Sequence, residues 1–239
     1  MIKENQIAGS KLYWVANKTI SDSFPPVDLA LRDPDGLLAI GGDLTTERLL
    51  DAYSKGIFPW FDYGQPILWW SPDPRCILYP GEMHISKTLE KILKKNLFKV
   101  TFNNDFHKII RMCAKPRNGK ANTWITKDII DAYTLLDKDG HILSVECWYN
   151  EKLVGGIYGV IMGQIYFGES MFSSMSNASK IALFHLTNEL KKRDFKLIDC
   201  QIFSKHLNSL GARSMPRNDF IDTLKYYCQK TKKYSWPVK

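Results

Sequence analysis

A carboxylate and a carboxamide stand two residues apart in the segment 196–202, at Asp199 and Gln201. The segment is short, rich in apolar residues and follows a predicted helix, which is typical of a buried strand. Because side chains alternate across a strand, we expect both polar groups on one face, about 7 Å apart at the backbone. A buried carboxylate needs a partner or a chemical role. On residue types alone, a structural hydrogen-bonded pair is the more common explanation.

A second carboxylate, Glu169, lies between Gly168 and Ser170 in a segment that also carries Phe167 and Phe172. An acidic residue in such apolar surroundings is unusual for the edge of a protein core. Glu169 is therefore either a structural acceptor at the end of a strand or an anionic group that pairs with a cation.

Tryptophans and prolines gather between residues 56 and 75, where Trp60, Trp69 and Trp70 occur close together. This composition excludes a regular helix and favours rigid loops. The segment forms either a small hydrophobic core or a preformed aromatic wall, since such side chains stack bases and line apolar pockets.

Lysines line one side of a predicted amphipathic helix over residues 85–95, with Ser86 as its N-cap. Four of them share the face opposite the apolar stripe: Lys87, Lys91, Lys94 and Lys95. A lysine stripe is often only a solvated surface, but it is also what binding to nucleic-acid phosphates requires.

The elements that must position these side chains predict an α+β protein. A small, proline-rich N-terminal domain (residues 1–80) precedes a C-terminal domain (residues 81–239) with a mixed β-sheet flanked by helices. In the second domain we expect strands at 142–149, 153–161 and 164–169, a helix at 178–193 capped by Asn177, strand 196–202 and a helix near 218–229. This order is typical of acetyltransferase-like (GNAT-like) domains. Residues 173–178 lack a GxG phosphate loop, which disfavours coenzyme A.

Composition narrows the class of protein. The 239 residues carry a net charge of +8, and 44% of them are hydrophobic, as in ordinary globular proteins. The charge favours a polyanionic partner. We expect no signal peptide, because the N-terminus has no apolar h-region, and no membrane partner, because no apolar run approaches ~18 residues. The five cysteines are scattered without metal-ligand spacing, which predicts reduced thiols in the cytoplasm and no metal.

Five motifs in register give the chain a family resemblance. Over roughly residues 24–212 it closely resembles the leucyl/phenylalanyl-tRNA–protein transferase family. The motifs are LLAIGGDL (37–44), GIFPW (56–60), LWWSPDPR (68–75), FGESMFS (167–173) and LIDCQ (197–201). The resemblance implies an aminoacyltransferase without a cofactor, and we expect a monomer. It would move Leu or Phe, with Met as a further donor, from aminoacyl-tRNA to proteins with N-terminal Arg or Lys, and so mark them for N-degron proteolysis.

The resemblance also implies roles for single residues. Asp199 and Gln201 would be the catalytic pair, with Glu169 in the same site. Trp60 and Trp124 match positions that hold the 3′-terminal adenosine of the tRNA. The basic side chain of the acceptor requires an anionic pocket, for which Glu169 and Asp199 are the candidates.

Four residues match the pocket for the donor side chain: Ile157, Tyr166, Leu186 and Leu190. All four depart from the family pattern. Ile157 replaces a familiar methionine, Tyr166 a phenylalanine, and the two leucines replace aromatic residues. We expect the pocket to remain apolar.

A carboxamide and a carboxylate suit aminolysis of an ester in different ways. Gln201 has no useful basicity, but its carbonyl oxygen can accept an N–H of the attacking amine and orient it. Asp199 could orient the amide NH₂ of Gln201 or take the proton through a water. We therefore predict that Gln201 positions the nucleophile and that Asp199 supplies the charge.

Other functions fit parts of this pattern. A coenzyme A-dependent N-acetyltransferase would share the α+β order, and a non-catalytic RNA-binding protein would use the basic helix and the tryptophans. Transfer of amino acids from tRNA to cell-wall precursors is a related chemistry that differs in the acceptor.

Overall fold

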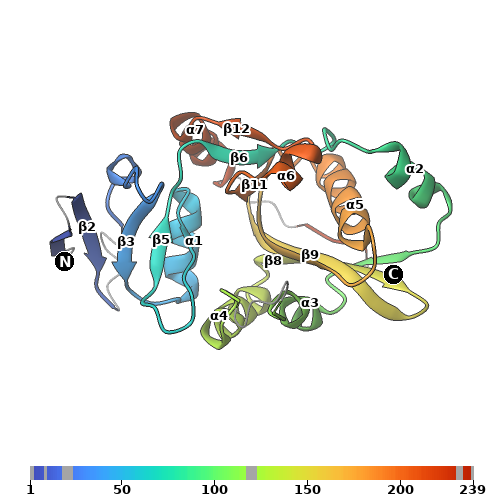
Figure 1. Cartoon of the computed structure of the whole chain (residues 1–239), viewed down its shortest axis with the longest axis horizontal. Helices are drawn as coiled ribbons and strands as arrows, with labels where there is room; N and C mark the ends of the chain where they lie inside the picture. Colours follow the sequence, from blue (N-terminus) through green and yellow to red (C-terminus); the bar gives the residue numbers. More distant parts are fainter. Residues whose placement is uncertain (1–2, 8–9, 18–23, 117–122, 230–233, 238–239) are drawn as a thin grey trace. The chain divides into compact units, whose positions relative to one another are not determined.

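The computed structural model describes residues 3–7, 10–17, 24–116, 123–229 and 234–237. The chain divides into two compact units, each built from separate segments (Figure 1). The first unit contains residues 1–75, 114–135 and 215–226, and the second contains residues 76–113, 136–214 and 227–239. The predicted boundary near residue 80 lies close to the end of the first of these segments. The two later segments were not part of the predicted N-terminal domain.

The first unit contains a five-stranded sheet in the order β1-β2-β3-β5-β4. Its elements are β1 (Lys3–Ile7), β2 (Ser10–Val15), η1 (Val27–Leu29), β3 (Leu37–Gly41), α1 (Thr46–Ser54), β4 (Phe58–Pro59), β5 (Leu68–Trp70), most of α4 (Lys127–Lys138) and most of α7 (Arg217–Tyr227). The aromatic stretch thus forms two short strands. Trp69 is completely buried and donates its indole N–H to the Gly41 carbonyl at 2.8 Å. Part of the predicted aromatic wall is therefore core.

Arg75 joins segments of the first unit that lie far apart in the sequence. It is almost completely buried, and its guanidinium lies over the rings of Phe58 and Phe220, 4.7 and 4.8 Å from their centroids. The same group donates a hydrogen bond to the Gly56 carbonyl at 3.1 Å. These contacts connect β4 and Gly56 with α7.

The second unit is built on a seven-stranded sheet in the order β12-β6-β11-β10-β9-β8-β7. Its strands are β6 (Arg75–Leu78), β7 (Lys99–Phe102), β8 (Ile142–Tyr149), β9 (Lys152–Met162), β10 (Ile165–Ser173), β11 (Leu197–Gln201) and β12 (Arg213–Met215). Strands β7 to β10 are antiparallel, β10 and β11 are parallel, and β11 and β6 are antiparallel. The predicted mixed sheet is confirmed.

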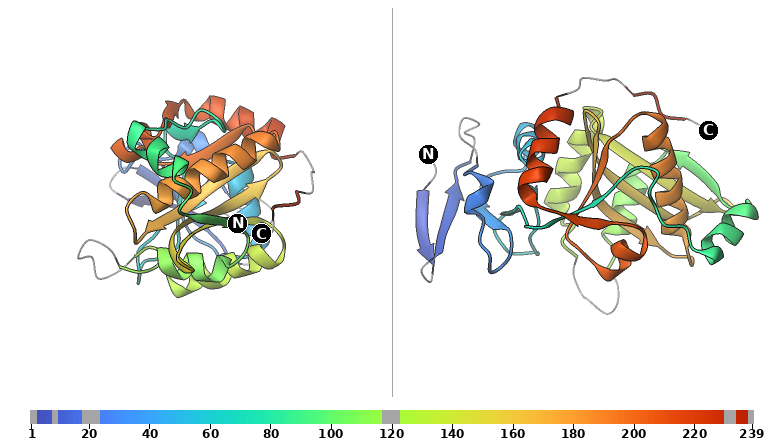
Figure 2. Two further views of the ribbon diagram at one scale, coloured as in Figure 1. Left: turned by 90° about the vertical axis from the view of Figure 1, so that its right-hand side faces the viewer. Right: turned by 90° about the horizontal axis from the view of Figure 1, so that it is seen from above.

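Helices cover both faces of this sheet. They are α2 (Lys87–Lys94), α3 (Phe106–Cys113), α5 (Ala178–Lys192) and α6 (Lys205–Ser209). The adjacent glycines of β9 mark the two faces, because a Cβ at Gly155 would meet Ala178 of α5 and one at Gly156 would meet Ile109 of α3. Figure 2 shows strands β8 to β10 between α3 and α5. The predicted α+β class with helices flanking the sheet is confirmed.

Strand β10 is longer than the sequence indicated. It was predicted over 164–169, but it continues to Ser173. The difference arises at Glu169, where the register against β9 shifts between Gly168 and Ser170. Such a bulge adds a residue without ending a strand. Glu169 therefore lies inside a strand and not at its end.

The bounds of the other predicted elements of this unit agree closely with those in the structure. Helix α5 begins after Asn177, although the Asn177 side chain makes no capping hydrogen bond. Helix α2 is shorter than the predicted 85–95, and the Ser86 hydroxyl accepts the Leu89 N–H at 3.2 Å as its N-cap. Across the described residues, we find no helix with the length and apolar character needed to span a membrane.

A buried carboxylate that the sequence did not single out, Glu146 on β8, stabilises one corner of the second unit. It accepts hydrogen bonds from the hydroxyls of Thr101 and Ser144, both at 2.6 Å. It also accepts the main-chain N–H groups of Asn104 and Asp105, which lead into α3. The carboxylate therefore connects β7, β8 and the start of α3.

We expect Glu146→Gln to lower the free energy of unfolding by about 1–2 kcal/mol, because neutral hydrogen bonds replace charge-assisted ones. Urea unfolding at pH 7 measures the change. The exposed Glu151→Gln serves as the matched control. An unchanged Glu146→Gln unfolding curve would contradict a stabilising role for this network.

Candidate active site

Strands β10 and β11 separate in the middle of the sheet. Their parallel pairing extends to Phe167 and Asp199, and immediately afterwards each strand contains a bulge. Glu169 is the extra residue of β10 and Cys200 that of β11. Because bulges bend strands and end regular pairing, the two chains diverge here. The predicted polar residues thus occur where the sheet opens.

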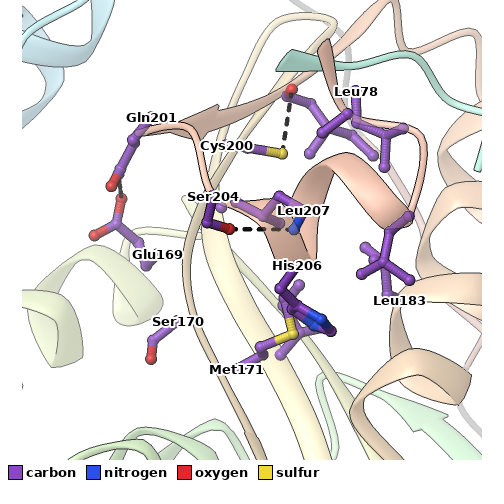
Figure 3. A pocket seen from close by; sticks show the side chains of 15 residues that line it. Leu78, Glu169, Ser170, Met171, Leu183, Cys200, Gln201, Ser204, His206 and Leu207 are labelled. Atoms are coloured by element: carbon purple, nitrogen blue, oxygen red, sulfur yellow. Dashed lines mark hydrogen bonds between the residues drawn. The ribbon is translucent and has the colours of Figure 1, made fainter. Parts of the chain in front are cut away.

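A pocket of about 280 Å³ lies at this opening (Figure 3). Most of its lining is apolar and includes Ile157, Met171, Leu183, Ile198, Leu207 and Leu210. Figure 3 shows Glu169 and Gln201 together at one end of the pocket, with Leu78 and Leu183 at the other. The pocket therefore joins an apolar interior to a polar end.

The amide of Gln201 is oriented by Glu169. Gln201 Nε2 donates a hydrogen bond to Glu169 Oε1 at 2.9 Å, and only 9% of Glu169 is exposed. Because an ionised carboxylate only accepts hydrogen bonds, the NH₂ group must face Glu169. The carbonyl oxygen of Gln201 is consequently turned away from Glu169, where it can accept a hydrogen bond from another group.

Asp199 acts on the main chain of the same residue. Its side chain is completely buried, and Oδ1 accepts the Gln201 N–H at 2.9 Å. Gln201 has a φ of +62°, a left-handed conformation that costs energy for residues other than glycine. The hydrogen bond that Gln201 N–H donates to Asp199 stabilises this backbone, so the carboxylate holds Gln201 in place.

Two details of the predicted strand were wrong. Asp199 and Gln201 do not share one face, because the bulge and the positive φ turn Gln201 toward the pocket that Ile198 and Cys200 line. The amide of Gln201 is bonded by Glu169, whereas Asp199 was considered for that contact. Strict alternation, on which both expectations depended, fails at a bulge.

Groups near the two carboxylates remain protonated. Burial and the nearby negative charge of Asp199 raise the pKa of the Cys228 thiol to about 12. Burial, and then the charge of Glu169, raise the pKa of Tyr166 well above its ordinary value. At neutral pH both are therefore uncharged neighbours, and the Tyr166 hydroxyl donates to the Leu143 carbonyl at 3.4 Å.

The four side chains predicted for the donor pocket occupy different positions. Ile157 lines the pocket. Tyr166, Leu186 and Leu190 are completely buried in the hydrophobic core beneath α5. They are not part of the lining. Substitutions there would change the packing behind the pocket before they changed its surface.

Sequence reasoning missed the wall that follows β11. Helix α6 and the turn after it bring Leu207, Leu210 and Ala212 to the pocket. These apolar residues follow one another at spacings of three and two positions, which was the available signal for a wall here. Met171 was also missed, because the strand was predicted to end before it, and Leu183 was missed although its helix was predicted.

The two tryptophans predicted to hold adenosine belong to the first unit, and the pocket belongs to the second. Trp60 is 42% exposed, and the centroids of the Trp60 and Trp70 rings lie 5.6 Å apart. The Trp70 indole N–H donates to the Trp60 carbonyl at 2.7 Å. Trp124 is half-buried in a bend before α4.

All four predicted lysines are exposed on α2 or at its end: Lys87, Lys91, Lys94 and Lys95. Lys94 also forms an ion pair with Glu90 at 2.7 Å. The lysine stripe thus remains available to an anionic partner, although Glu90 already pairs with Lys94. In the part of the chain that the structure describes, no three His, Cys, Asp or Glu side chains form a metal-binding group.

The site is an apolar pocket with an oriented carboxamide at its polar end, on a mixed β-sheet, and the family of the chain identifies it as an aminoacyltransferase. The model of the family described as leucyl/phenylalanyl-tRNA protein transferase matches residues 77–225, and that of its N-terminal domain matches residues 42–73. The chain belongs to this family, as the sequence motifs predicted.

Relatives with the name leucyl/phenylalanyl-tRNA–protein transferase match most of the chain. The protein of Pseudomonas syringae pv. tomato is 53% identical, over 89% of this chain and 92% of the relative. That of Nitrosospira multiformis is 50% identical, over 89% and 90%. Among solved structures, an aminoglycoside acetyltransferase from a soil metagenome in complex with trehalose covers 60% of this chain and 98% of its own, with 12% identity and a TM-score of 0.35.

Proposed function

We propose that this enzyme transfers Leu or Phe, and also Met, from aminoacyl-tRNA to the α-amine of proteins that begin with Arg or Lys. The observation that carries the proposal is the Glu169–Gln201 pair at the polar end of an apolar pocket. The pocket would take the donor side chain, and the pair would meet the acceptor. Family membership supports transfer from aminoacyl-tRNA to protein.

The energetics of this reaction need no further activation. The aminoacyl ester is already reactive, and an α-amine with an ordinary pKa of about 7.7–8.0 has a useful neutral fraction at pH 7. Holding amine and ester in near-attack geometry contributes up to about 7–11 kcal/mol. The protein therefore has mainly to bind and orient two substrates.

Gln201 would be the group that contacts the nucleophile. Its carbonyl oxygen accepts one N–H of the acceptor amine and directs the nitrogen lone pair at the ester carbonyl. The C–N bond forms, the acyl C–O bond between the ester carbonyl carbon and the ribose oxygen breaks, and the leaving ribose oxygen gains the proton that the amine loses. Asp199 contributes by holding the Gln201 main chain and by its negative charge near the developing ammonium.

Glu169 would recognise the basic side chain of the acceptor. Asp199 was predicted to share this role, but it is completely buried and bound to the Gln201 N–H. Glu169 lines the pocket, and a carboxylate has two oxygens with several lone pairs. It can bind the Gln201 amide and still pair with a guanidinium or ammonium group.

The rest of the tRNA would be held without sequence readout. We propose that Trp60 and Trp124 stack the 3′-terminal adenosine and that the lysines of α2 contact phosphates. Ile157 contacts the donor side chain directly, and Tyr166, Leu186 and Leu190 support the pocket from the core. We further propose that the enzyme acts as a monomer in the cytoplasm, where the product would enter N-degron proteolysis.

Replacing Lys87 and Lys91 together with glutamine should raise the KM for Phe-tRNA several-fold, because two phosphate contacts are lost. The slope of log KM against log salt should fall by about one per lysine. Initial rates between 50 and 200 mM KCl measure both. The double variant of Lys152 and Lys180, which are not on α2, is the control. An unchanged slope would show that the stripe is only a solvated surface.

The proposal is tested by incubating the protein with labelled Phe-tRNA or Leu-tRNA and with peptides that begin with Arg, Lys, Ala or Asp. We expect label only on the Arg and Lys peptides. Label on cell-wall precursors, or acetyl transfer from coenzyme A, would indicate a different acceptor or donor. Binding of RNA regardless of the charged 3′ end, without transfer, would indicate a non-catalytic protein.

A further inference from the structure

Two exposed apolar side chains directly follow Gln201 in the chain. Ile202 and Phe203 follow Gln201, and they expose 42% and 48% of their surface. Gln201 before them and Ser204 after them both line the pocket, whereas the two residues between are not part of the lining. Ile202 and Phe203, here termed the apolar ledge, therefore adjoin the pocket lining along the chain without being part of it.

The local backbone explains this exposure. Strand β11 ends at Gln201, whose φ of +62° turns the chain, and Ser204 then caps α6 by accepting the Leu207 N–H at 3.1 Å. The ledge is thus held between two fixed points, the bulged strand end and the helix start. Its two side chains have little freedom to fold back into the core.

We propose that the apolar ledge binds the side chain of the second residue of the acceptor polypeptide and so extends specificity beyond the N-terminal residue. The inference rests on the proposed function. If the acceptor amine contacts Gln201, the next Cα of the acceptor lies about 3.8 Å further along its chain. The second residue therefore reaches the surface immediately next to Gln201, which is the ledge.

The chemistry of the ledge favours a polypeptide over RNA as its occupant. Neither side chain carries a charge or a hydrogen-bond donor, so neither offers anything to a phosphate. The ring of Phe203 offers a flat surface for base stacking, but the aliphatic Ile202 beside it does not, whereas both side chains offer apolar surface to a side chain of the acceptor. Apolar second residues, such as Leu, Met or Phe, would bury surface against both side chains.

The test compares Arg-Leu and Arg-Gly peptides of otherwise identical sequence as acceptors at saturating Phe-tRNA. For the unaltered enzyme we expect a KM about five- to tenfold lower for Arg-Leu, from partial burial of one leucine side chain. In the double variant Ile202→Ser/Phe203→Ser the two KM values should converge, and Phe203→Leu should retain most of the preference. The exposed Leu97→Ser is the matched control and should keep the full preference.

Each result decides between distinct outcomes. Equal KM values in the unaltered enzyme, or a preference that survives the double variant, would overturn the ledge but leave transfer to Arg peptides intact. If the double variant had a higher KM for Phe-tRNA with every acceptor, the ledge would contact tRNA instead. Absence of transfer to any Arg or Lys peptide would overturn the proposed function itself. Thermal melting of the variants separates all of these from misfolding.

Discussion

Replacing Asp199 with asparagine should lower kcat by about 10²- to 10³-fold, while the KM values of both substrates change little. The buried carboxylate accepts the Gln201 N–H and stabilises its left-handed backbone. Asparagine retains an acceptor oxygen at this position but loses the charge, which strengthens that hydrogen bond and stabilises the developing ammonium. Single-turnover rates with charged tRNA and an Arg peptide, both saturating, measure the effect.

Asp199→Ala provides the second comparison. It leaves the Gln201 N–H without this acceptor, so we expect it to lower the melting temperature as well as kcat. Asp199→Asn should melt close to the unaltered protein. Near-normal turnover by Asp199→Asn would contradict the proposed role. A loss of kcat that only follows the loss of folded protein would reduce Asp199 to a structural residue.

Glu169→Gln should raise the KM of an Arg peptide about 10- to 100-fold and leave the KM for Phe-tRNA nearly unchanged. The variant keeps an oxygen that can accept the Gln201 amide, but it removes the charge that would pair with the acceptor guanidinium. Hydrogen bonds to charged groups contribute about 1.5–3 kcal/mol, which sets this range. Initial rates with each substrate varied in turn measure both constants.

An uncharged acceptor gives the sharpest control for Glu169. A peptide that begins with citrulline has nearly the shape of one that begins with Arg but lacks the positive charge. The unaltered enzyme should bind it about as weakly as Glu169→Gln binds the Arg peptide. For the Glu169→Gln variant, replacing Arg with citrulline should not raise the KM further. The charge reversal Glu169→Lys should act more strongly on the acceptor than on tRNA. Equal losses for both substrates would instead indicate misfolding, and Glu151→Gln is the matched exposed control.

The sequence allowed prediction of the elements of the second unit, because their patterns depend on local spacing. The meander from residue 142 and the helix after Asn177 show this clearly. The exact geometry of the site could not be predicted in the same way. A bulge leaves no mark in a period-two pattern, so the faces of Asp199 and Gln201 and the length of β10 were both misjudged.

Tertiary packing decided the remaining differences. Tyr166, Leu186 and Leu190 are apolar enough for either a pocket or a core, and only their complete burial in the hydrophobic core distinguishes the two. The wall formed by Leu207 and Leu210 depends on a helix of one turn, which has too few residues for a periodic signal. Residue type thus identified the polar groups more reliably than the surfaces around them.

The discontinuous first unit has a consequence for biosynthesis. Arg75 lies between Phe58 and Phe220, so part of its environment is supplied by a residue near the end of the chain. On the ribosome, the N-terminal segment would emerge long before these partners and could not complete its packing. Such long-range closure slows folding and leaves apolar surface exposed in the meantime. We therefore expect nascent chains that stop before α7 to be captured by chaperones, although they already contain every residue of the pocket.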